Sequence, residues 1–472
     1  MFSIMSSSIR QTGKIILIMV VIISMLWDTS YAEDNTSDSA DGASTVVCPT
    51  EVVKLPLNNK KSIASMYSFM NDRTYQVNKP KIVSVTRSGL LVPLTKGTAQ
   101  LTVTKIADTA AMGSGEAAAD AVPSSCTLQL QVVDAAPYKG TFKPKTEIRK
   151  VKVGSKSFSV QTISIPKGLP VDIGLAKNTV GNVEELKSMA SRRNADFAIN
   201  GTYFEAYGGI PEPYGTLIAN GELIHVTQNG TTVGFTADGS AKMDTLRLKI
   251  EGGTDGSYDY KNNWYAVFVN RTPTAGGNSS IVFTPERGDR IGFAFGKAIV
   301  VNNGVVEKIT ENENVKIPRD GFVIVLTGSV KKSLEKKFEV GKKVHYRLKY
   351  FNADGKELDW SDVVTAVGAG PRVLKDGKVF IQAELEGFKQ AKILSTPAAR
   401  SGIGIKADGS VVLVTVGGAT IKELGEILRS LGAQQGMNLD GGASSGMYAN
   451  GKLLTTPGRL LSNSLLFGVG LK

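Results

Sequence analysis

Repeated Asn-Gly and Asp-Gly pairs are the feature that most constrains how residues 158–472 can fold. Both central residues of a type I′ turn take positive φ, which Asn, Asp and Gly tolerate, so each pair predicts a β-hairpin. The chain has 51 glycines without a collagen-like period, which also favours tight turns. The pairs interpreted as hairpin turns are Asn220-Gly221, Asp238-Gly239, Asn303-Gly304, Asp376-Gly377, Asp408-Gly409 and Asn450-Gly451.

Two segments of the same region have helical periodicity instead. Residues 182–193 carry Val183, Leu186 and Met189 at helical spacing. A second helix begins at Thr420, where Glu423 completes a capping box ahead of an apolar face. Helices among hairpins predict an α+β domain over residues 158–472, with a mixed or antiparallel, hairpin-rich sheet flanked by helices.

The first 32 residues have the pattern of a secretory signal peptide. Arg10 and Lys14 precede an apolar run at 15–27, and residues 30–32 (Ser-Tyr-Ala) fit a cleavage site. An uncleaved membrane anchor is the alternative, although the run is short for a helix that must cross ~30 Å of hydrocarbon. We expect a secreted or envelope-associated chain with a flexible leader at 33–46. No later apolar run reaches 18 residues, so no membrane span is expected in the mature chain.

The chain is basic, with a formal net charge of +12 that loss of the signal peptide lowers by one. Basic residues gather at 139–156 and 331–349. Such runs are usually solvated surface, but a basic exported chain is attracted to anions, which makes an anionic cell-wall polymer a candidate partner. No recognition motif accompanies the export signal, so no nucleic-acid partner is expected.

Residues 47–134 form short alternating runs that predict a small all-β sandwich. Segments 81–85, 88–90 and 96–103 resemble bacterial Ig-like domains. Cys48 and Cys126 lie near the first strand and at the start of the last. Because export permits oxidation, we expect a disulfide between them, with two free thiols as the alternative. Residues 107–125 are expected to be a disordered loop, and 135–157 a basic linker running into a first strand.

Four segments place polar residues beside glycines where the strand pattern stops. Glycine allows a ligand to approach the backbone closely, and loops on a rigid scaffold often carry function. Any single segment is compatible with an ordinary turn, but four together favour a binding or catalytic site. The segments are 198–204, 367–372, 399–404 and 437–446.

These segments, in this order, resemble the phosphodiester glycosidase family over about residues 155–472, most specifically at Asn438-Leu439-Asp440-Gly441-Gly442. The resemblance implies hydrolysis of a sugar from a sugar-1-phosphodiester. Thr202 and Ala443 stand where many relatives have glycine, which leaves the polar groups in place. Supporting similarities lie at 214–218, Asn220-Gly221, Asn270-Arg271, and Gly458-Arg459 with Asn463.

The implied reaction assigns roles to these residues. Cleavage at an anomeric carbon usually uses a carboxylate as nucleophile or base; Asp440 is the first choice, and Glu205 and Glu212 are weaker ones. Arginine binds phosphodiesters bidentately, so Arg372 and Arg400, and in addition Arg271 or Arg459, are candidates for the phosphate, with core arginines paired to aspartates as the alternative. The residues expected to bind substrate are Asn200, Tyr203, Arg271, Asn438, Gly441, Gly442, Ser444, Ser445 and Asn463.

Rival chemistries have weaker support. Residues 442–446 match the G-x-S-x-G elbow of serine hydrolases, but no histidine follows His345. Asn438 and Asp440 could ligate a hard cation, yet no D-x-D loop or His cluster accompanies them, so we assign no metal and no cofactor. Three hypotheses remain: a secreted hydrolase acting on a phosphorylated glycan, a non-catalytic glycan-binding or exopolysaccharide-assembly protein with the same pocket, and a maturation factor that transfers the sugar.

Overall fold

The computed structural model describes residues 48–57, 59–66, 73–105, 125–134 and 140–471. The predicted signal peptide and leader, and nearly all of the insert at 107–125, lie outside these residues. None of the helices in the described part of the chain has the length and apolar character needed to cross a bilayer.

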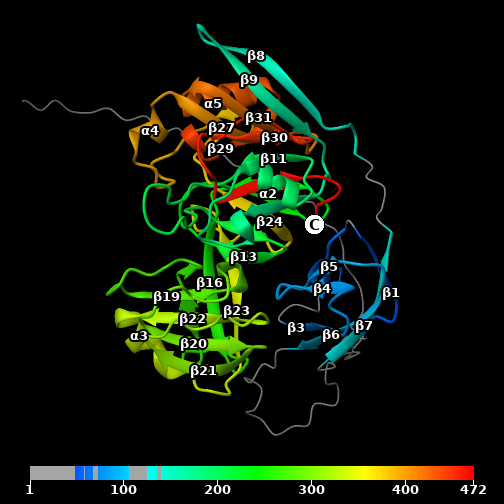
Figure 1. The fold of residues 1–472 in the computed structure, drawn as a ribbon, viewed down its shortest axis with the longest axis vertical. Helices are drawn as coiled ribbons and strands as arrows, with labels where there is room; N and C mark the ends of the chain where they lie inside the picture. Colours follow the sequence, from blue (N-terminus) through cyan, green and yellow to red (C-terminus); the bar gives the residue numbers. More distant parts are fainter. Residues whose placement is uncertain (1–47, 58, 67–72, 106–124, 135–139, 472) are drawn as a thin grey trace, which may run out of the picture. The chain divides into compact units, whose positions relative to one another are not determined.

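The N-terminal module is built from two small sheets with a common core (Figure 1). Leu128 of the first sheet and Leu91 of the second belong to that core, and both are fully buried. A disulfide joins Cys48 to Cys126 in β7. The Ig-like assignment stays a prediction. The first sheet has the order β1 (Val52–Pro56), β7 (Ser125–Val133), β6 (Gly97–Lys105) and β3 (Arg73–Val77), and the second β2 (Lys61–Ser62), β5 (Leu90–Pro93) and β4 (Val83–Val85); α1 is Ile63–Met66.

Three antiparallel sheets share the core of the main domain, to which they contribute Ile403, Leu465 and Val367 respectively. The first has the order β26 (Lys378–Val379), β25 (Arg372–Lys375), β29 (Ala433–Asn438), β27 (Ala398–Lys406), β28 (Val411–Ala419), β9 (Lys156–Ile165) and β8 (Lys145–Val153). The second has β10 (Val171–Leu175), β32 (Asn463–Phe467), β11 (Phe197–Asn200), β30 (Met447–Ala449) and β31 (Lys452–Thr455). The third has β13 (Glu222–His225), β12 (Leu217–Ala219), β24 (Val363–Gly368), β14 (Thr232–Thr236) and β15 (Ala241–Asp244).

The two predicted helices are present, although sheets dominate. In α5 (Ile421–Ser430) the Thr420 hydroxyl accepts from the Glu423 amide and the Glu423 carboxylate accepts from the Thr420 amide, which confirms the capping box. Its apolar face, including Leu424 and Leu428, packs on the seven-stranded sheet. The helix predicted at 182–193 is shorter: α2 spans Leu186–Arg192 and packs against β11 and β30.

The six Asn-Gly and Asp-Gly pairs named above as hairpin turns all connect neighbouring antiparallel strands, as predicted. In four of them both residues have positive φ, as a type I′ turn requires. At Asp238-Gly239 and Asp408-Gly409 only the glycine does. There the glycine amide donates to the carbonyl three residues back, as in a type I turn followed by a left-handed glycine.

A second group of strands, between residues 247 and 351, packs around large side chains such as Trp264, Phe322 and Ile324, in a core to which β12, β13 and β24 of the third sheet also contribute. This second lobe was not distinguished from the rest of the domain in the sequence. It contains the sheets β17 (Trp264–Ala266), β16 (Arg247–Thr254), β23 (Val344–Phe351), and β18 (Phe268–Val269), β19 (Ser279–Phe283), β22 (Gly321–Thr327), β20 (Lys297–Asn302), β21 (Val305–Glu311), with α3 (Gly328–Leu334).

Candidate functional site

Three of the four polar segments meet where β11, β27 and β29 come together. Asn200, at the end of β11, is 1% exposed. Its amide nitrogen donates to the Asp440 carbonyl (2.7 Å), and its carbonyl oxygen accepts from the Ser401 hydroxyl (2.7 Å) and the Gly446 amide (3.0 Å). One buried asparagine therefore fixes the loop after β29 against the other two strands.

The fourth segment, residues 367–372, is connected to the other three through the Gly370 carbonyl. This carbonyl accepts from the Tyr203 hydroxyl (2.9 Å) and the Asn438 amide nitrogen (3.1 Å), and that nitrogen also donates to Tyr203 Oη (2.7 Å). Burial raises the pKa of Tyr203, so its hydroxyl stays protonated and able to donate. All four segments singled out in the sequence thus contribute to one polar cluster.

Asn463, at the start of β32, supports the same cluster from the neighbouring sheet. Its side-chain oxygen accepts from the Thr202 amide (2.8 Å). A Cβ on Gly201 would lie 2.0 Å from this oxygen, so only glycine fits there. Because β32 lies between β10 and β11, Asn463 is carried by an interior strand.

Asp440 is the carboxylate at the centre of this cluster. Its Oδ1 accepts from the Gly441 amide (2.9 Å), and the Ser444 side chain also donates to the carboxylate. Burial raises the pKa of Asp440 to about 6, while these hydrogen bonds and the charges of Arg459 and Lys392 act in the opposite direction. The carboxyl can therefore exchange a proton near neutral pH, as a catalytic acid or base must.

Three buried polar atoms of the cluster have no hydrogen-bond partner among the described residues: Thr202 Oγ1, Asn438 Oδ1 and Ser445 Oγ. All three residues are at most 4% exposed. A buried polar atom left unpaired costs roughly 1–3 kcal/mol, so proteins usually keep such atoms for water or a ligand. The cluster thus offers an acceptor and two hydroxyls, which suits a ligand rich in hydroxyl groups.

Two of the arginines predicted to bind phosphate, Arg372 and Arg400, are buried, and their side chains bond to the protein. Arg372 Nε donates to the Leu374 carbonyl (3.3 Å), and its Nη2 donates to Gln435. Arg400 Nε donates to the Ala419 carbonyl (3.0 Å). Arg400 nevertheless lies near the cluster, because a Cβ on Gly441 would be 3.9 Å from its Cδ.

Glu205 and Glu212, in the loop after β11, form hydrogen bonds and an ion pair with residues other than those of the polar cluster. Glu205 accepts from the Tyr207 and Gly208 amides and from the Tyr214 hydroxyl (2.6 Å), and the last of these contributes most to lowering its pKa. Glu205 thereby shapes an exposed loop. The Arg271 guanidinium, predicted to bind substrate, lies 4.4 Å from the Phe268 ring centroid.

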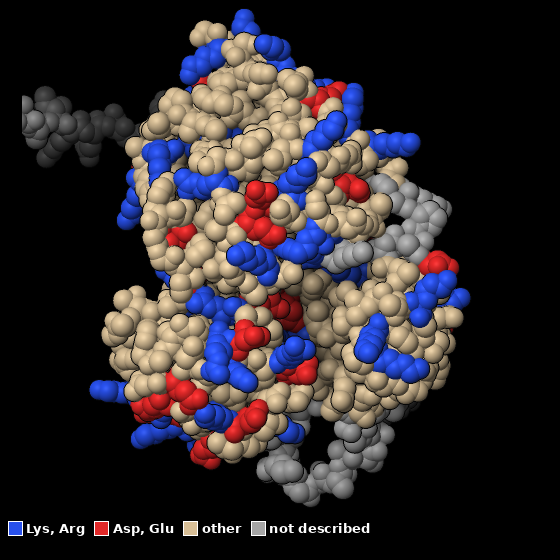
Figure 2. All heavy atoms as spheres, in the orientation of Figure 1, with Lys and Arg blue, Asp and Glu red and all other residues tan. Residues whose placement is uncertain are grey.

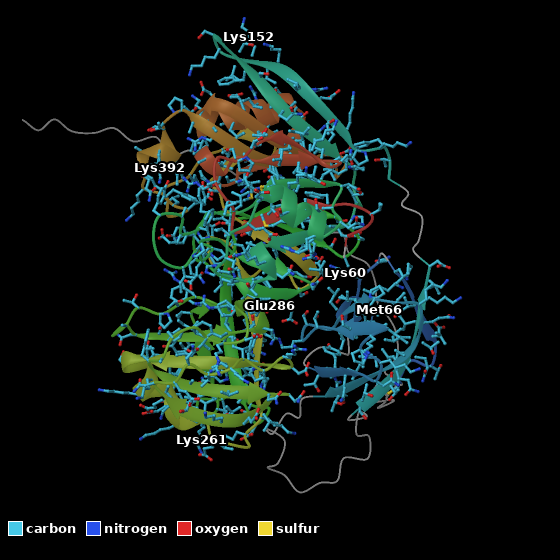
Figure 3. The ribbon with its side chains drawn as sticks, in the orientation of Figure 1. Lys60, Met66, Lys152, Lys261, Glu286 and Lys392 are labelled. Atoms are coloured by element: carbon cyan, nitrogen blue, oxygen red, sulfur yellow. A yellow bond between two sulfur atoms is a disulfide. The ribbon has the colours of Figure 1, made fainter. Side chains whose placement is uncertain are left out.

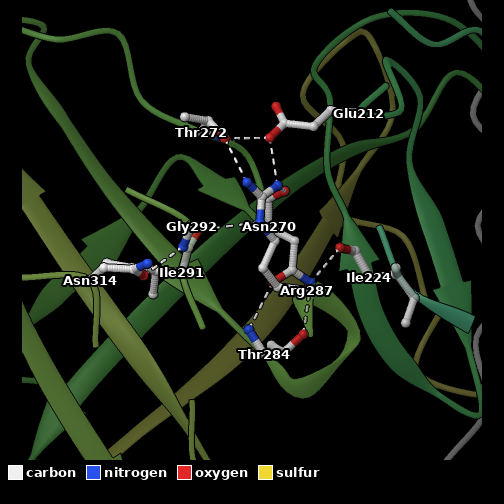
Figure 4. Close-up of polar contacts among 9 residues, drawn as sticks. All are labelled: Glu212, Ile224, Asn270, Thr272, Thr284, Arg287, Ile291, Gly292 and Asn314. Atoms are coloured by element: carbon white, nitrogen blue, oxygen red, sulfur yellow. Dashed lines mark hydrogen bonds and ion pairs between the residues drawn. The ribbon is translucent and has the colours of Figure 1, made fainter. Parts of the chain in front are cut away.

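Glu212 forms a buried ion pair with Arg287 (2.5 Å), shown in Figure 4. Arg287 Nη2 also donates to the Thr272 hydroxyl (2.7 Å), and Nη1 donates to the Asn270 carbonyl (3.2 Å). This network fastens the loop after β11 to the second lobe, so Glu212 has a structural partner for its charge.

Within the part of the chain that the structure describes, no group of three or more His, Cys, Asp or Glu side chains is placed to hold a metal ion.

His225 is 1% exposed, and its Nδ1 lies 2.8 Å from the Gly215 carbonyl oxygen. Burial lowers the pKa of His225 to about 4, so the ring is neutral at pH 7.

Both basic stretches contain ion pairs: in the first, Lys145 and Arg149 pair with Glu147, and Lys156 pairs with Glu423. In the second, Lys331, Lys342, Arg347 and Lys349 form ion pairs with neighbouring carboxylates. The first runs along β8 and β9, and Lys and Arg side chains gather at the end of this hairpin in Figure 2. Figure 3 labels Lys152 at its tip.

The architecture is that of a sheet-rich domain built from several antiparallel sheets. The model of the phosphodiester glycosidase family matches residues 295–468. That match supports the resemblance for the part of the chain that contains Asn438 and Asp440; Asn200 precedes it. No curated protein matches the chain in sequence.

Two solved structures share the fold at low identity, and a third has a TM-score below 0.5. A hypothetical protein from Synechocystis is 19% identical with a TM-score of 0.61, over 87% of this chain and 81% of that one. A Burkholderia pseudomallei K96243 protein described as exported is 19% identical with a TM-score of 0.53, over 66% and 74%. The catalytic domain of zebrafish N-acetylglucosamine-1-phosphodiester α-N-acetylglucosaminidase is 13% identical, with a TM-score of 0.38, over 69% and 83%.

The sequence missed residues that support the cluster. Ser401 and Thr202 lie inside segments that were singled out, but neither was assigned a role. Lys392 and Tyr207 belong to no motif in the sequence. The fold alone brings the Lys392 ammonium group over the Tyr207 ring and its charge close to Asp440. The sequence could not connect Lys392 with Asp440, because the two residues lie far apart along the chain.

Proposed function

We propose that the chain is an extracytoplasmic hydrolase that releases a sugar, such as N-acetylglucosamine, from a sugar-1-phosphodiester in a cell-surface or extracellular glycan. The carrying observation is the partly buried Asp440 carboxyl, with a pKa raised to about 6, in one cluster with three unpaired buried polar atoms. The family match over residues 295–468 supports the reaction class. The disulfide and the signal-like N-terminus support the location.

The geometry supports distinct roles for the site residues. Asp440 is largely ionised at pH 7 and would act on the anomeric carbon as nucleophile, or on the attacking water as base. In the overall reaction the bond from C1 to the phosphate oxygen breaks, its electron pair leaves with the phosphate, and water supplies the new hydroxyl and one proton. Asn438 Oδ1, Thr202 Oγ1 and Ser445 Oγ would hold sugar hydroxyls.

The test is hydrolysis of UDP-N-acetylglucosamine and a panel of sugar-1-phosphate diesters by residues 33–472, measured as free sugar. We expect Asp440→Asn to lower kcat/KM at least 100-fold. Asp408→Asn, which removes the same charge at a hairpin turn, should stay within twofold. Equal activity of wild type and Asp440→Asn would refute the assignment of Asp440.

Two alternatives predict different outcomes of this test. A glycan-binding protein would bind a phosphorylated glycan saturably without releasing product over hours. A transferase would move the sugar to an added acceptor instead of to water, which product analysis with and without acceptor distinguishes. The same unpaired polar atoms could serve a bound sugar in both cases.

A further inference from the structure

Two cations approach one exposed aromatic ring beside Asp440. The Tyr207 side chain is 80% exposed. Arg459 Cζ lies 5.0 Å from its ring centroid, and Arg459 Nη2 donates to its hydroxyl (3.2 Å). Lys392 Nζ lies 5.8 Å from the same centroid. The three residues come from the loop after β11, from α4 (Ala391–Leu394) and from the segment between β31 and β32; Figure 3 labels Lys392.

Neither of these two cations, Lys392 and Arg459, has a carboxylate partner in the part of the chain that the structure describes, whereas many other basic side chains form ion pairs there. Both nevertheless act electrostatically on Asp440. Two positive charges that are near the site carboxyl and not neutralised by the protein create a local field that attracts an anion.

Backbone contacts hold both cations near the site. Arg400 Nη2 donates to the carbonyls of Lys392 (3.0 Å) and Thr396 (2.7 Å), so this buried arginine fixes α4. The Gly458 amide donates to the Ala443 carbonyl (2.7 Å), which ties the segment of Arg459 to the turn that follows Asp440. The cations are therefore placed by the same loops that build the site.

We propose that Lys392 and Arg459, together against the ring of Tyr207, bind the phosphoryl group of the substrate; this assignment rests on the proposed function. A phosphodiester carries one negative charge, and the departing monoester acquires a second. Cations at this position therefore stabilise the products of bond cleavage more than the substrate, which promotes catalysis. Arg400 would then be a positioning residue for Lys392 rather than a direct ligand of the phosphate.

The experiment compares two substrates with the same sugar: a sugar-1-phosphodiester and a nitrophenyl glycoside, whose leaving group has no phosphate. We expect Lys392→Met and Arg459→Met each to lower kcat/KM at least tenfold on the phosphodiester and no more than twofold on the glycoside. Lys422→Met, on the exposed face of α5, is the matched control and should leave both unchanged. Equal losses on both substrates, or no loss, would overturn the assignment.

A second readout works even if no substrate is hydrolysed. Binding of glycerol phosphate, as a phosphate monoester probe, is measured by calorimetry for wild type and the same variants. We expect the dissociation constant to rise at least tenfold in Lys392→Met and Arg459→Met but not in Lys422→Met. Retained probe binding without hydrolysis would refute the proposed hydrolase and keep the phosphoryl site, whereas unchanged binding in both variants would refute the site itself.

Discussion

Neutralising Asp440 should make the protein more stable while abolishing its activity. The folded-state pKa of about 6 exceeds the value of 3.8 expected for an unfolded chain, so ionising this carboxyl disfavours the folded state. The difference corresponds to at most about 3 kcal/mol at pH 7. Because Asp440 keeps some contact with solvent, we expect Asp440→Asn to gain about 1–2 kcal/mol. Asparagine retains the oxygen that accepts from Gly441.

Because the pKa of Asp440 is higher in the folded state than in the unfolded chain, the gain in stability must depend on pH in one direction. Between pH 4 and 6 the folded protein binds more protons than the unfolded chain, so wild-type stability falls as pH rises through this window. The advantage of Asp440→Asn should therefore be near zero at pH 4 and complete above pH 6.5. Urea unfolding should be followed by circular dichroism, because Trp264 and Trp360 both lie in the core between the second lobe and the third sheet and would report on that core alone.

The control is Asp408→Asn. Hydrogen bonds from the Ser410 hydroxyl and amide lower the pKa of Asp408, so its charge stabilises the fold and its removal should slightly reduce stability at pH 7.5. A pH-independent difference between wild type and Asp440→Asn, or a loss of stability at pH 7.5, would show that burial does not govern the Asp440 carboxyl.

Three further outcomes are expected. Replacing Cys48 and Cys126 by serine should destabilise the N-terminal module by about 4 kcal/mol, from the chain entropy of a 78-residue separation, measured by its unfolding in urea. Arg287→Met should cost about 3–5 kcal/mol because it leaves Glu212 without its buried partner, and Arg287→Met with Glu212→Gln should recover much of that loss. Gly215→Ala should prevent stable folding, since its Cβ would lie 1.7 Å from a carbonyl oxygen at the end of β24; normal expression and melting temperature would contradict this.

Local features of the fold could be predicted from the sequence because short-range chemistry determines them. The capping box of Thr420 and Glu423 and the hairpin turns each depend on a few adjacent residues. The convergence of Asn200 and Asn438 followed from the ends of apolar strands. The strand order, including β32 between β10 and β11, could not be predicted, because it depends on pairings between residues far apart in the chain.

The sequence also could not predict toward which face of the sheet the Arg372 and Arg400 side chains point. Alternation along a strand predicts which face a side chain takes, but a bulge shifts the alternation by one residue. The pairing of β25 changes register between Arg372 and Leu374, and that of β27 changes between Ala398 and Arg400. Both arginines therefore lie where the alternation of inward and outward residues is interrupted. For this reason the hydrogen-bond partners of the two guanidinium groups could not be predicted from the sequence.

Because β32 lies inside its sheet, the site is complete only after this strand has been made, and β32 follows β11, β27 and β29 in the chain. Until Phe467 has been made, β10 and β11 lack the strand that joins them, and Thr202 lacks the Asn463 oxygen that holds its amide. A partly made chain emerging N-terminus first can form the hairpins that precede this strand but not the Asp440 pocket. If the proposed function is right, the chain cannot act on its substrate before residues 463–467 have been made.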